Sequence, residues 1–216
     1  MVKFSVVVVI PAFNEESTIS NVVKSIRKYA TIVVVNDAST DKTSHVSKDS
    51  GAIVVNHKTN KGYDGAINSG FIKAKELGCD AIITFDADGQ HKPEMLNSFI
   101  ENLKNGVDLV LGVRPNSARF SEFIFSLYTK IRFNWSDPLC GMKGYSIKLY
   151  NQKGCFDTYK SIGTDLALFG LKNGFSNIQI PIEINKRSDN PRFSSSIKSN
   201  IYILLALFRS LGSHNR

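Results

Sequence analysis

The chain has 216 residues, of which 42% are hydrophobic, and it carries a formal net charge of +8. This length supports one full hydrophobic core, so we expect a single domain over residues 1–216. The positive charge predicts anionic partners such as a nucleotide, a phospholipid surface or a phosphorylated acceptor. No apolar run reaches the roughly 20 residues that a transmembrane helix needs, so we expect no membrane-spanning segment.

The cysteines indicate a reducing compartment. There are three of them, Cys79, Cys140 and Cys155, and they form no C-x-x-C pair, which argues against a disulfide framework. The first apolar run, residues 4–10, is too short for a signal peptide. We therefore expect a protein that is cytoplasmic, either free or peripheral on the cytoplasmic face of the membrane.

Strands and helices alternate along the first half of the chain. The Val/Ile run 4–10 is typical of a strand covered on both faces. We expect Pro11 to end this strand and Asn14 to cap the helix that follows. Further strands are predicted at residues 32–35, 52–55, 81–85, 109–112 and 178–184. This alternation predicts an α/β fold with a mostly parallel central sheet and helices on both faces.

Polar residues follow several of these strands. Ligands in parallel α/β sheets bind at the carboxyl ends of the strands, where the segment 11–15, Asp37 and the pair Asp86 and Asp88 are expected. Because strand side chains alternate, Asp86 and Asp88 point to the same side. Two carboxylates suit Mg²⁺ or Mn²⁺ bound to a diphosphate. A solvated loop after a buried strand would explain the same pattern.

Small residues mark the start of the helix after Asn60. Gly62, Gly65, Ala66 and Gly70 allow close approach of a ligand or a neighbouring element, and a helix N-terminus favours anions. Plain helix packing would also explain them.

The second half of the chain lacks the regular alternation of strand and helix patterns. Residues 137–146 are rich in turn formers, a helix is predicted at 165–172, and no linker or repeat separates the halves. We therefore divide the chain into a nucleotide-binding half, 1–112, and an acceptor half, 113–216.

The last helix, predicted at 195–211, is amphipathic. The residues that share its apolar face are Ile197, Ile201, Leu204, Leu205 and Phe208. Lys198 and Arg209 lie at the margins of this face, which suits a membrane surface or a partner. Packing against the core of the protein itself is the alternative.

Several motifs together carry a family resemblance. They are Pro11-Ala12-x-Asn14-Glu15, Asn36-Asp37-Ala38-Ser39-x-Asp41, Asn60-x-Gly62, Asp86-Ala87-Asp88-Gly89-Gln90-His91, Asp137-Pro138-x-x-Gly141-Met142-Lys143 and the segment from Asp165 to Arg187. In order and spacing they resemble family 2 glycosyltransferases, especially dolichyl- and polyprenyl-phosphate sugar transferases. Nearly the whole chain is covered.

The resemblance implies a GT-A nucleotide-diphospho-sugar transferase fold and an inverting, metal-dependent hexosyltransferase. The donor would be a UDP- or GDP-sugar, and the acceptor a phosphate-bearing lipid or glycan. Asp86 and Asp88 would hold Mg²⁺ or Mn²⁺ on the donor diphosphate. The implied nucleotide-sugar-binding residues are Pro11, Ala12, Asn14, Glu15, Asp37, Lys61, Gly62, Asp86, Ala87, Gln90 and Arg114. The implied catalytic residues are Asp88, Lys143, Asp165 and Arg187, with Arg114, Lys143 and Arg187 facing phosphate.

Three departures from the family pattern leave the acceptor open. Lys143 stands where arginine is usual, which replaces a bidentate fork with a point charge. Asp165 stands where polyprenyl-phosphate enzymes usually have glutamate, and in other members an aspartate near this position is the catalytic base. The segment after Arg187 is longer than usual. The acceptor is therefore either a polyprenyl phosphate or a sugar hydroxyl.

Two other classes fit less well. A nucleic-acid-binding protein would explain the charge, but we find no RNP-type aromatic motif, zinc knuckle or recognition helix, so no nucleic-acid partner is expected. A sugar-1-phosphate nucleotidylyltransferase normally begins with a glycine-rich pyrophosphate loop, and residues 9–14 contain no glycine.

Overall fold

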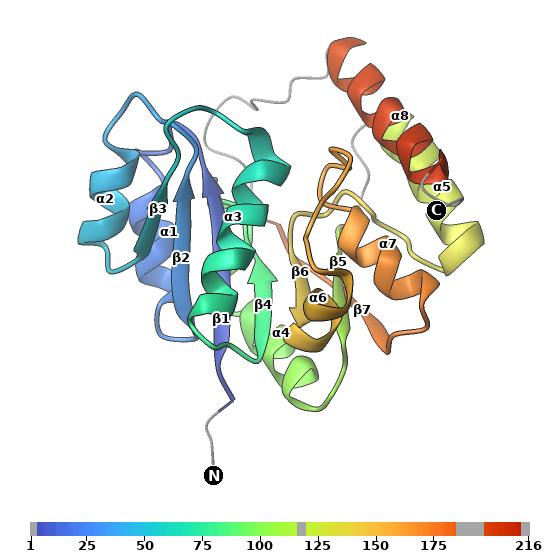
Figure 1. Cartoon of the computed structure of the whole chain (residues 1–216), viewed down its shortest axis with the longest axis horizontal. Helices are drawn as coiled ribbons and strands as arrows, with labels where there is room; N and C mark the ends of the chain where they lie inside the picture. The colour runs from blue at the N-terminus through green and yellow to red at the C-terminus, as the bar shows by residue number, and fades with distance from the viewer. Residues whose placement is uncertain (1–3, 116–119, 185–196, 213–216) are drawn as a thin grey trace.

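A computed structural model describes residues 4–115, 120–184 and 197–212 (Figure 1). Its centre is a seven-stranded sheet with the order β3-β2-β1-β4-β6-β5-β7. The strands are β1 Val6–Ala12, β2 Thr31–Asn36, β3 Ile53–Asn56, β4 Ala81–Thr84, β5 Leu109–Val113, β6 Lys143–Ser146 and β7 Asn177–Pro181. All neighbouring strands run parallel except β6, which is antiparallel to both β4 and β5. The predicted mostly parallel sheet is confirmed.

Helices cover both faces of the sheet, as predicted. They are α1 Ile19–Ile26, α2 Thr43–Asp49, α3 Gly62–Glu76, α4 Met95–Lys104, α5 Phe120–Phe133, α6 Ile147–Lys153, α7 Asp165–Lys172 and α8 Ile197–Gly212. The apolar sides of α1 and α4 pack on one face, and those of α3, α6 and α7 pack on the other. None of the helices in the described part of the chain is long and apolar enough to cross a bilayer.

Successive side chains of β1 point to opposite faces of the sheet, and both faces are covered, which explains why its sequence is apolar throughout. Val8 and Ile10 belong to the core under α1, whereas Val7 and Val9 belong to the core under α3. Helix α3 approaches β1 so closely that a Cβ at Gly70 would lie 2.2 Å from Val9 Cγ1. Glycine at this position therefore brings the N-terminus of α3 to the carboxyl edge of the sheet.

The two predictions for the loop after β1 were wrong. Strand β1 continues through Pro11 and Ala12, which pair with Val35 and Asn36, because proline removes only its own N–H and the neighbouring residues continue the ladder. Asn14 does not cap α1. Its backbone has φ 54° and its Oδ1 accepts a hydrogen bond from Thr40 N at 2.8 Å, so α1 begins five residues later.

Strand β6 lies in the turn-rich segment and was not predicted. Its sequence, Lys143-Gly144-Tyr145-Ser146, offers no alternating apolar pattern, yet it inserts between β4 and β5. Thr84 Oγ1 donates to Gly141 O at 2.6 Å and accepts from Lys143 N at 3.1 Å. These bonds fix the turn before β6 against the end of β4, so residues of the two halves share one sheet.

Helices α5 and α8 pack together at one edge of the molecule (Figure 1). Phe125 of α5 and Ile203, Ala206 and Leu207 of α8 form a separate small core between them. Ser121 Oγ also donates to Asn200 Oδ1 at 2.6 Å. One side of α8 is therefore buried against the protein, which agrees with the alternative prediction that this helix packs against the protein itself.

Candidate functional site

The carboxyl ends of β1, β2 and β4 meet the N-terminus of α3 around a cavity of about 380 Å³, here named the edge pocket. Its lining residues are Pro11, Ala12, Phe13, Glu15, Asp37, Asn60, Gly62, Tyr63, Ala66, Asp86, Ala87 and Asp88. Most of them belong to the set that the sequence predicted for nucleotide-sugar binding. Asp88 was predicted as a metal ligand and catalytic residue. Phe13, Asn60, Tyr63 and Ala66 were in no predicted set, although Asn60, Tyr63 and Ala66 lie within the glycine-rich segment from Asn60 to Gly70.

The Asp86 carboxylate is positioned by His91 and Gly141. Its Oδ2 lies 2.9 Å from Nε2 of His91, whose side chain is only 4% exposed. A Cβ at residue 141 would lie 2.1 Å from the same Oδ2, so Gly141 leaves room for the carboxylate. Burial by itself raises the pKa of Asp86, but the His91 hydrogen bond and the charges of Lys143 and Arg114 outweigh it and lower the pKa. Asp86 is therefore ionised at neutral pH.

Asp88 completes the carboxylate pair. Its Oδ1 accepts a hydrogen bond from Gln90 N at 3.0 Å, and both aspartates line the edge pocket. In the part of the chain that the structure describes, no group of three or more His, Cys, Asp or Glu side chains could hold a metal ion. A pair of carboxylates fits a Mg²⁺-like cation that takes its remaining ligands from a bound diphosphate and water.

Asp37 fixes the start of α3. Its carboxylate accepts hydrogen bonds from Lys61 N and Gly62 N, both at 2.8 Å, and lies 2.6 Å from Nδ1 of His57. His57 is buried in this arrangement, since its side chain is 4% exposed and its Nε2 lies 2.8 Å from Ser69 Oγ. Asp37 thus combines a place on the edge pocket with a capping role.

The loop after β1 is anchored by the loop after β2. Asn14 N donates to Ser39 Oγ at 2.9 Å, and Glu15 N donates to Thr43 Oγ1 at 2.7 Å. Glu15 is buried and lines the edge pocket, whereas Asn14 does not line it. The motifs around Asn14 and Asp37 are therefore parts of one hydrogen-bonded unit.

Lys143 lies beneath the site. It is 2% exposed, its Nζ donates to Cys140 O at 2.6 Å, and it sits 5.7 Å from the centre of the Trp135 ring. Burial lowers its pKa, while the negative charges of Asp137 and Asp86 oppose this change. The lysine does not line the edge pocket, and it compensates the carboxylate charge of Asp86 from within.

Arg114 is engaged by acidic neighbours. Its Nε donates to Asp137 Oδ2 at 2.7 Å, its Nη2 donates to Asp137 Oδ1 at 2.8 Å, and Nη2 reaches Glu122 Oε2 at 3.3 Å. It lines a neighbouring cavity beside α5 together with Phe123 and Leu127. Arg187, the third predicted phosphate contact, lies outside the described residues.

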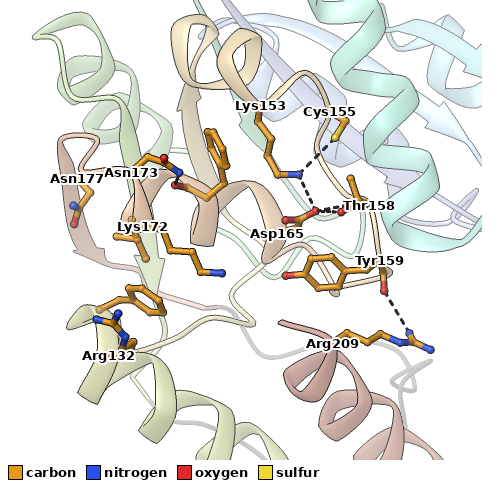
Figure 2. Close-up of a pocket in the computed structure, with 13 residues that line it drawn as sticks. Arg132, Lys153, Cys155, Thr158, Tyr159, Asp165, Lys172, Asn173, Asn177 and Arg209 are labelled. Atoms are coloured by element: carbon orange, nitrogen blue, oxygen red, sulfur yellow. Dashed lines mark hydrogen bonds and ion pairs between the residues drawn. The ribbon is translucent and has the colours of Figure 1, made fainter. Parts of the chain in front are cut away.

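Asp165 lines a different cavity from Asp86 and Asp88 (Figure 2). Its Oδ2 accepts hydrogen bonds from Lys153 Nζ at 2.8 Å, Thr158 N at 2.9 Å and Thr158 Oγ1 at 2.7 Å. The lining of this cavity and that of the edge pocket share no described residue. The structure therefore does not bring Asp165 together with Asp86 and Asp88.

The loop 157–164 reaches the edge pocket through Tyr63 and Asp64. Asp64 accepts hydrogen bonds from Ile162 N at 3.1 Å and Gly163 N at 2.6 Å, and a Cβ at Gly163 would lie 3.1 Å from the Tyr63 ring. Burial and the charge of Asp157 raise the pKa of Asp64 to about 6. A buried carboxylate thus ties the second half of the chain to the first turn of α3.

Comparison with known proteins identifies the family. The sequence model of glycosyl transferase family 2 matches residues 7–161, which is most of the chain. The chain belongs to glycosyl transferase family 2. It is also 32% identical over 200 residues to an uncharacterised protein of Methanocaldococcus jannaschii, covering 84% of this chain and 82% of that protein.

Two named relatives are lipid-phosphate sugar transferases. The chain is 36% identical to a UDP-N-acetylglucosamine–dolichyl-phosphate N-acetylglucosaminyltransferase of Methanococcus voltae, over 49% of this chain and 50% of that protein. It is 30% identical to an undecaprenyl-phosphate mannosyltransferase of Micrococcus luteus, over 65% of each chain. The matched regions thus span half to two thirds of the lengths of these relatives.

A solved structure confirms the GT-A-type fold. Glucosyl-3-phosphoglycerate synthase from Mycobacterium tuberculosis, solved with Mn²⁺, UDP and glucosyl-3-phosphoglycerate, superposes with a TM-score of 0.77 at 20% identity. The superposition covers 97% of this chain and 80% of the synthase. The family 2 glycosyltransferase predicted from the motifs is therefore confirmed as to family and fold.

Asp64 makes folding stability depend on pH. Because its pKa is raised from 3.8 to about 6 in the folded state, its ionisation opposes folding, and the free energy of unfolding falls as pH rises between these values. This pKa shift corresponds to about 3 kcal/mol in the free energy of unfolding.

We expect Asp64→Asn to remove this decline in the free energy of unfolding, measured by urea unfolding across the same pH window. Asp49→Asn, at an exposed site, should keep the wild-type pH profile. Parallel profiles for wild type and Asp64→Asn would show that Asp64 titrates normally.

Proposed function

We propose that this glycosyltransferase moves a sugar from a UDP- or GDP-sugar in the edge pocket to a polyprenyl phosphate, with inversion. The observation that carries the proposal is the edge pocket itself. Motifs from four separate strand-to-helix connections converge there, with Asp37 at one strand end and the pair Asp86 and Asp88 at another. This is the place where parallel α/β sheets bind their ligands.

The nucleoside is assigned to the side of the pocket formed by Pro11, Glu15 and Asp37. Asp37 lies at the end of β2, next to β1, which contains Pro11 and is followed by the loop that carries Glu15. Its carboxylate already holds the first turn of α3, so it would shape this end of the pocket and present the Lys61–Gly62 backbone to the donor. Backbone at a helix N-terminus is a favourable place for a phosphate.

Asp86 and Asp88 would hold Mg²⁺ or Mn²⁺. The bound cation would stabilise the negative charge that the nucleoside diphosphate develops as it leaves. The solved complex of the mycobacterial synthase with Mn²⁺ and UDP supports a divalent cation in this fold. The buried His91 keeps Asp86 aimed at the pocket, and Lys143 limits the repulsion between the two carboxylates.

A phosphate acceptor agrees with the surroundings of Asp165. A polyprenyl phosphate is already anionic near neutral pH and needs no general base, whereas a sugar hydroxyl needs one within hydrogen-bond reach. Asp165 is 7% exposed, is bound to Lys153 and Thr158, and does not line the edge pocket. The named functions of the Methanococcus and Micrococcus relatives also favour a lipid phosphate. Transfer to a sugar hydroxyl is the second candidate.

Contact with the membrane interface is assigned to α5 and α8. Exposed large apolar side chains recur on both helices, namely Phe120, Phe123, Leu127 and Ile131 on α5 and Ile201, Leu205, Phe208 and Leu211 on α8. Two packed helices that both keep apolar side chains in water suit the boundary between headgroups and acyl chains. The predicted apolar face of α8 is thus partly exposed, with Leu204 half-buried and the side chain of Ile197 outside the described residues.

Removing the Asp88 carboxylate tests the metal assignment. We expect Mn²⁺ to enhance the thermal stabilisation of the wild type by UDP or GDP, since a ligand that binds only the folded state raises its stability. In Asp88→Asn this enhancement should vanish and sugar transfer should fall at least a hundredfold. Asp49→Asn serves as the charge-matched control at an exposed position. Normal metal dependence and turnover in Asp88→Asn would refute the assignment.

Asp165→Asn separates the two acceptor classes. If the acceptor is a polyprenyl phosphate, turnover should stay within about tenfold of wild type, because no general base is needed. Loss of about 10² to 10⁴ in turnover, with unchanged donor affinity and thermal stability, would instead show that Asp165 is a base for a hydroxyl acceptor.

Polar substitution of the exposed phenylalanines tests the membrane contact. We expect Phe123→Ser/Phe208→Ser to weaken binding to vesicles of phosphatidylcholine and phosphatidylglycerol at least tenfold, since each large apolar side chain contributes about 1.5–3 kcal/mol when fully buried. The control Ile72→Ser/Leu77→Ser removes exposed apolar side chains from α3 and from the residue directly after it. Equal vesicle binding by both variants would locate the contact elsewhere.

A further inference from the structure

Tyr63 lines the edge pocket although no predicted set contained it. It is the second residue of α3, directly after Gly62, and its side chain is half-buried. Within the described residues, the Tyr63 hydroxyl makes no hydrogen bond. A hydroxyl group in this position can bind a ligand without giving up a bond within the protein.

The loop 157–164 determines where the Tyr63 ring lies. A Cβ at residue 163 would lie 3.1 Å from Cε1 of Tyr63 and 3.7 Å from its hydroxyl oxygen, so Gly163 lies directly against the ring. Gly163 has φ 72°, a backbone conformation that residues with a Cβ rarely adopt. Glycine at this position thus lets the loop turn and leaves room for the ring.

Two side chains of α3 hold this loop in place. Asp64 accepts hydrogen bonds from Ile162 N at 3.1 Å and Gly163 N at 2.6 Å. One turn further along the helix, Asn68 Oδ1 accepts a bond from Asp157 N at 3.2 Å, and Asn68 Nδ2 donates to Asp157 O at 3.0 Å. The loop is therefore fixed to α3 near both of its ends.

The backbone of the loop is strained at Ile162. This residue has φ 57°, which is unusual for a side chain branched at Cβ. Such a conformation costs free energy and persists only where surrounding contacts impose it, which is common at ligand-binding sites. Here these contacts are the hydrogen bond to Asp64 and the packing of Ile162 against the small core between α5 and α8. The strain thus agrees with a loop whose position serves the neighbouring pocket.

The Tyr63 hydroxyl keeps its proton. Burial raises the pKa of Tyr63 well above its usual value, and the charges of Asp86 and Asp64 raise it further. A protonated phenol adds no negative charge to a pocket that already contains Asp86 and Asp88, and it offers an O–H donor to an anionic ligand. Hydrogen bonds to an ionised acceptor are among the stronger ones in proteins.

We propose that the Tyr63 hydroxyl donates a hydrogen bond to the diphosphate of the sugar donor, and that Gly163, held by Asp64, positions the ring for this contact. The inference rests on the proposed function, in which the diphosphate binds the N-terminal backbone of α3 and the cation held by Asp86 and Asp88. Tyr63 lies in the first turn of α3 and lines the same pocket as both aspartates. A diphosphate bound there would come within reach of its side chain.

Tyr63→Phe tests the contact, because it removes only the hydroxyl group and keeps the ring. The affinities for UDP and GDP are measured with Mn²⁺, and thermal stability is measured without nucleotide. The matched control is Tyr29→Phe, which removes the hydroxyl of another half-buried tyrosine outside the edge pocket. We expect Tyr63→Phe to bind the nucleoside diphosphate at least tenfold more weakly than the wild type, with unchanged thermal stability. Tyr29→Phe should change the affinity less than twofold.

Gly163→Ala tests the positioning by the loop. Its new Cβ would displace the Tyr63 ring, whereas the control Gly174→Ala imposes similar backbone strain at φ 71° with no described atom within 4 Å of its Cβ. We expect Gly163→Ala to weaken nucleotide binding at least fivefold and Gly174→Ala to leave it unchanged. The double variant Tyr63→Phe/Gly163→Ala should bind less than threefold more weakly than the weaker single variant, because both changes remove the same contact.

Equal nucleotide binding by Tyr63→Phe and Tyr29→Phe would overturn the contact and leave the donor site itself intact. Additive losses in the double variant would overturn the positioning role of Gly163, since independent effects add. If the wild type bound neither UDP nor GDP in the presence of Mn²⁺, the proposed donor site would be refuted together with this inference.

Discussion

The structure depends on the compensation of carboxylates gathered at one edge of a sheet. Asp37 and Asp86 stand at the ends of β2 and β4, the two parallel strands that flank β1, where few backbone groups remain to stabilise them. Different partners stabilise the two carboxylates. Asp37 accepts hydrogen bonds from the N–H groups of Lys61 and Gly62 and contacts His57. Asp86 contacts His91, and the charge of the buried Lys143 stabilises its ionised form. Because buried charge is costly unless it is paired, these partners are what allow two acidic side chains to line one pocket.

The same constraint explains why the second half of the chain enters the sheet. Strand β6 carries Lys143 to the end of β4, and the turn before it brings Gly141 against Asp86 and Cys140 O to the lysine ammonium. The second half of the chain thus contributes the charge of Lys143 and the space at Gly141 that accommodate the Asp86 carboxylate.

Much of the fold and the pocket could be predicted because the signals are local. Continuous Val/Ile runs mark β1 and β2, and polar residues directly after strands fall on the carboxyl edge whatever the details of packing. The pairing of β6, the burial of His57 and the engagement of Arg114 by Asp137 depend on partners 20 or more residues away. Residue type alone cannot show whether a basic side chain points to a ligand or to a neighbouring carboxylate.

Asp165 shows how a motif position and its surroundings can point to different roles. Its place in the sequence suggests a catalytic base, but its environment is that of a structural carboxylate that joins α6, the loop 157–164 and α7 through Lys153 and Thr158. Its Oδ2 accepts all three of these hydrogen bonds, so this oxygen is held by donors of the protein itself. In the proposed function, the edge pocket would therefore take an acceptor that arrives already charged, which is the property that a lipid phosphate supplies.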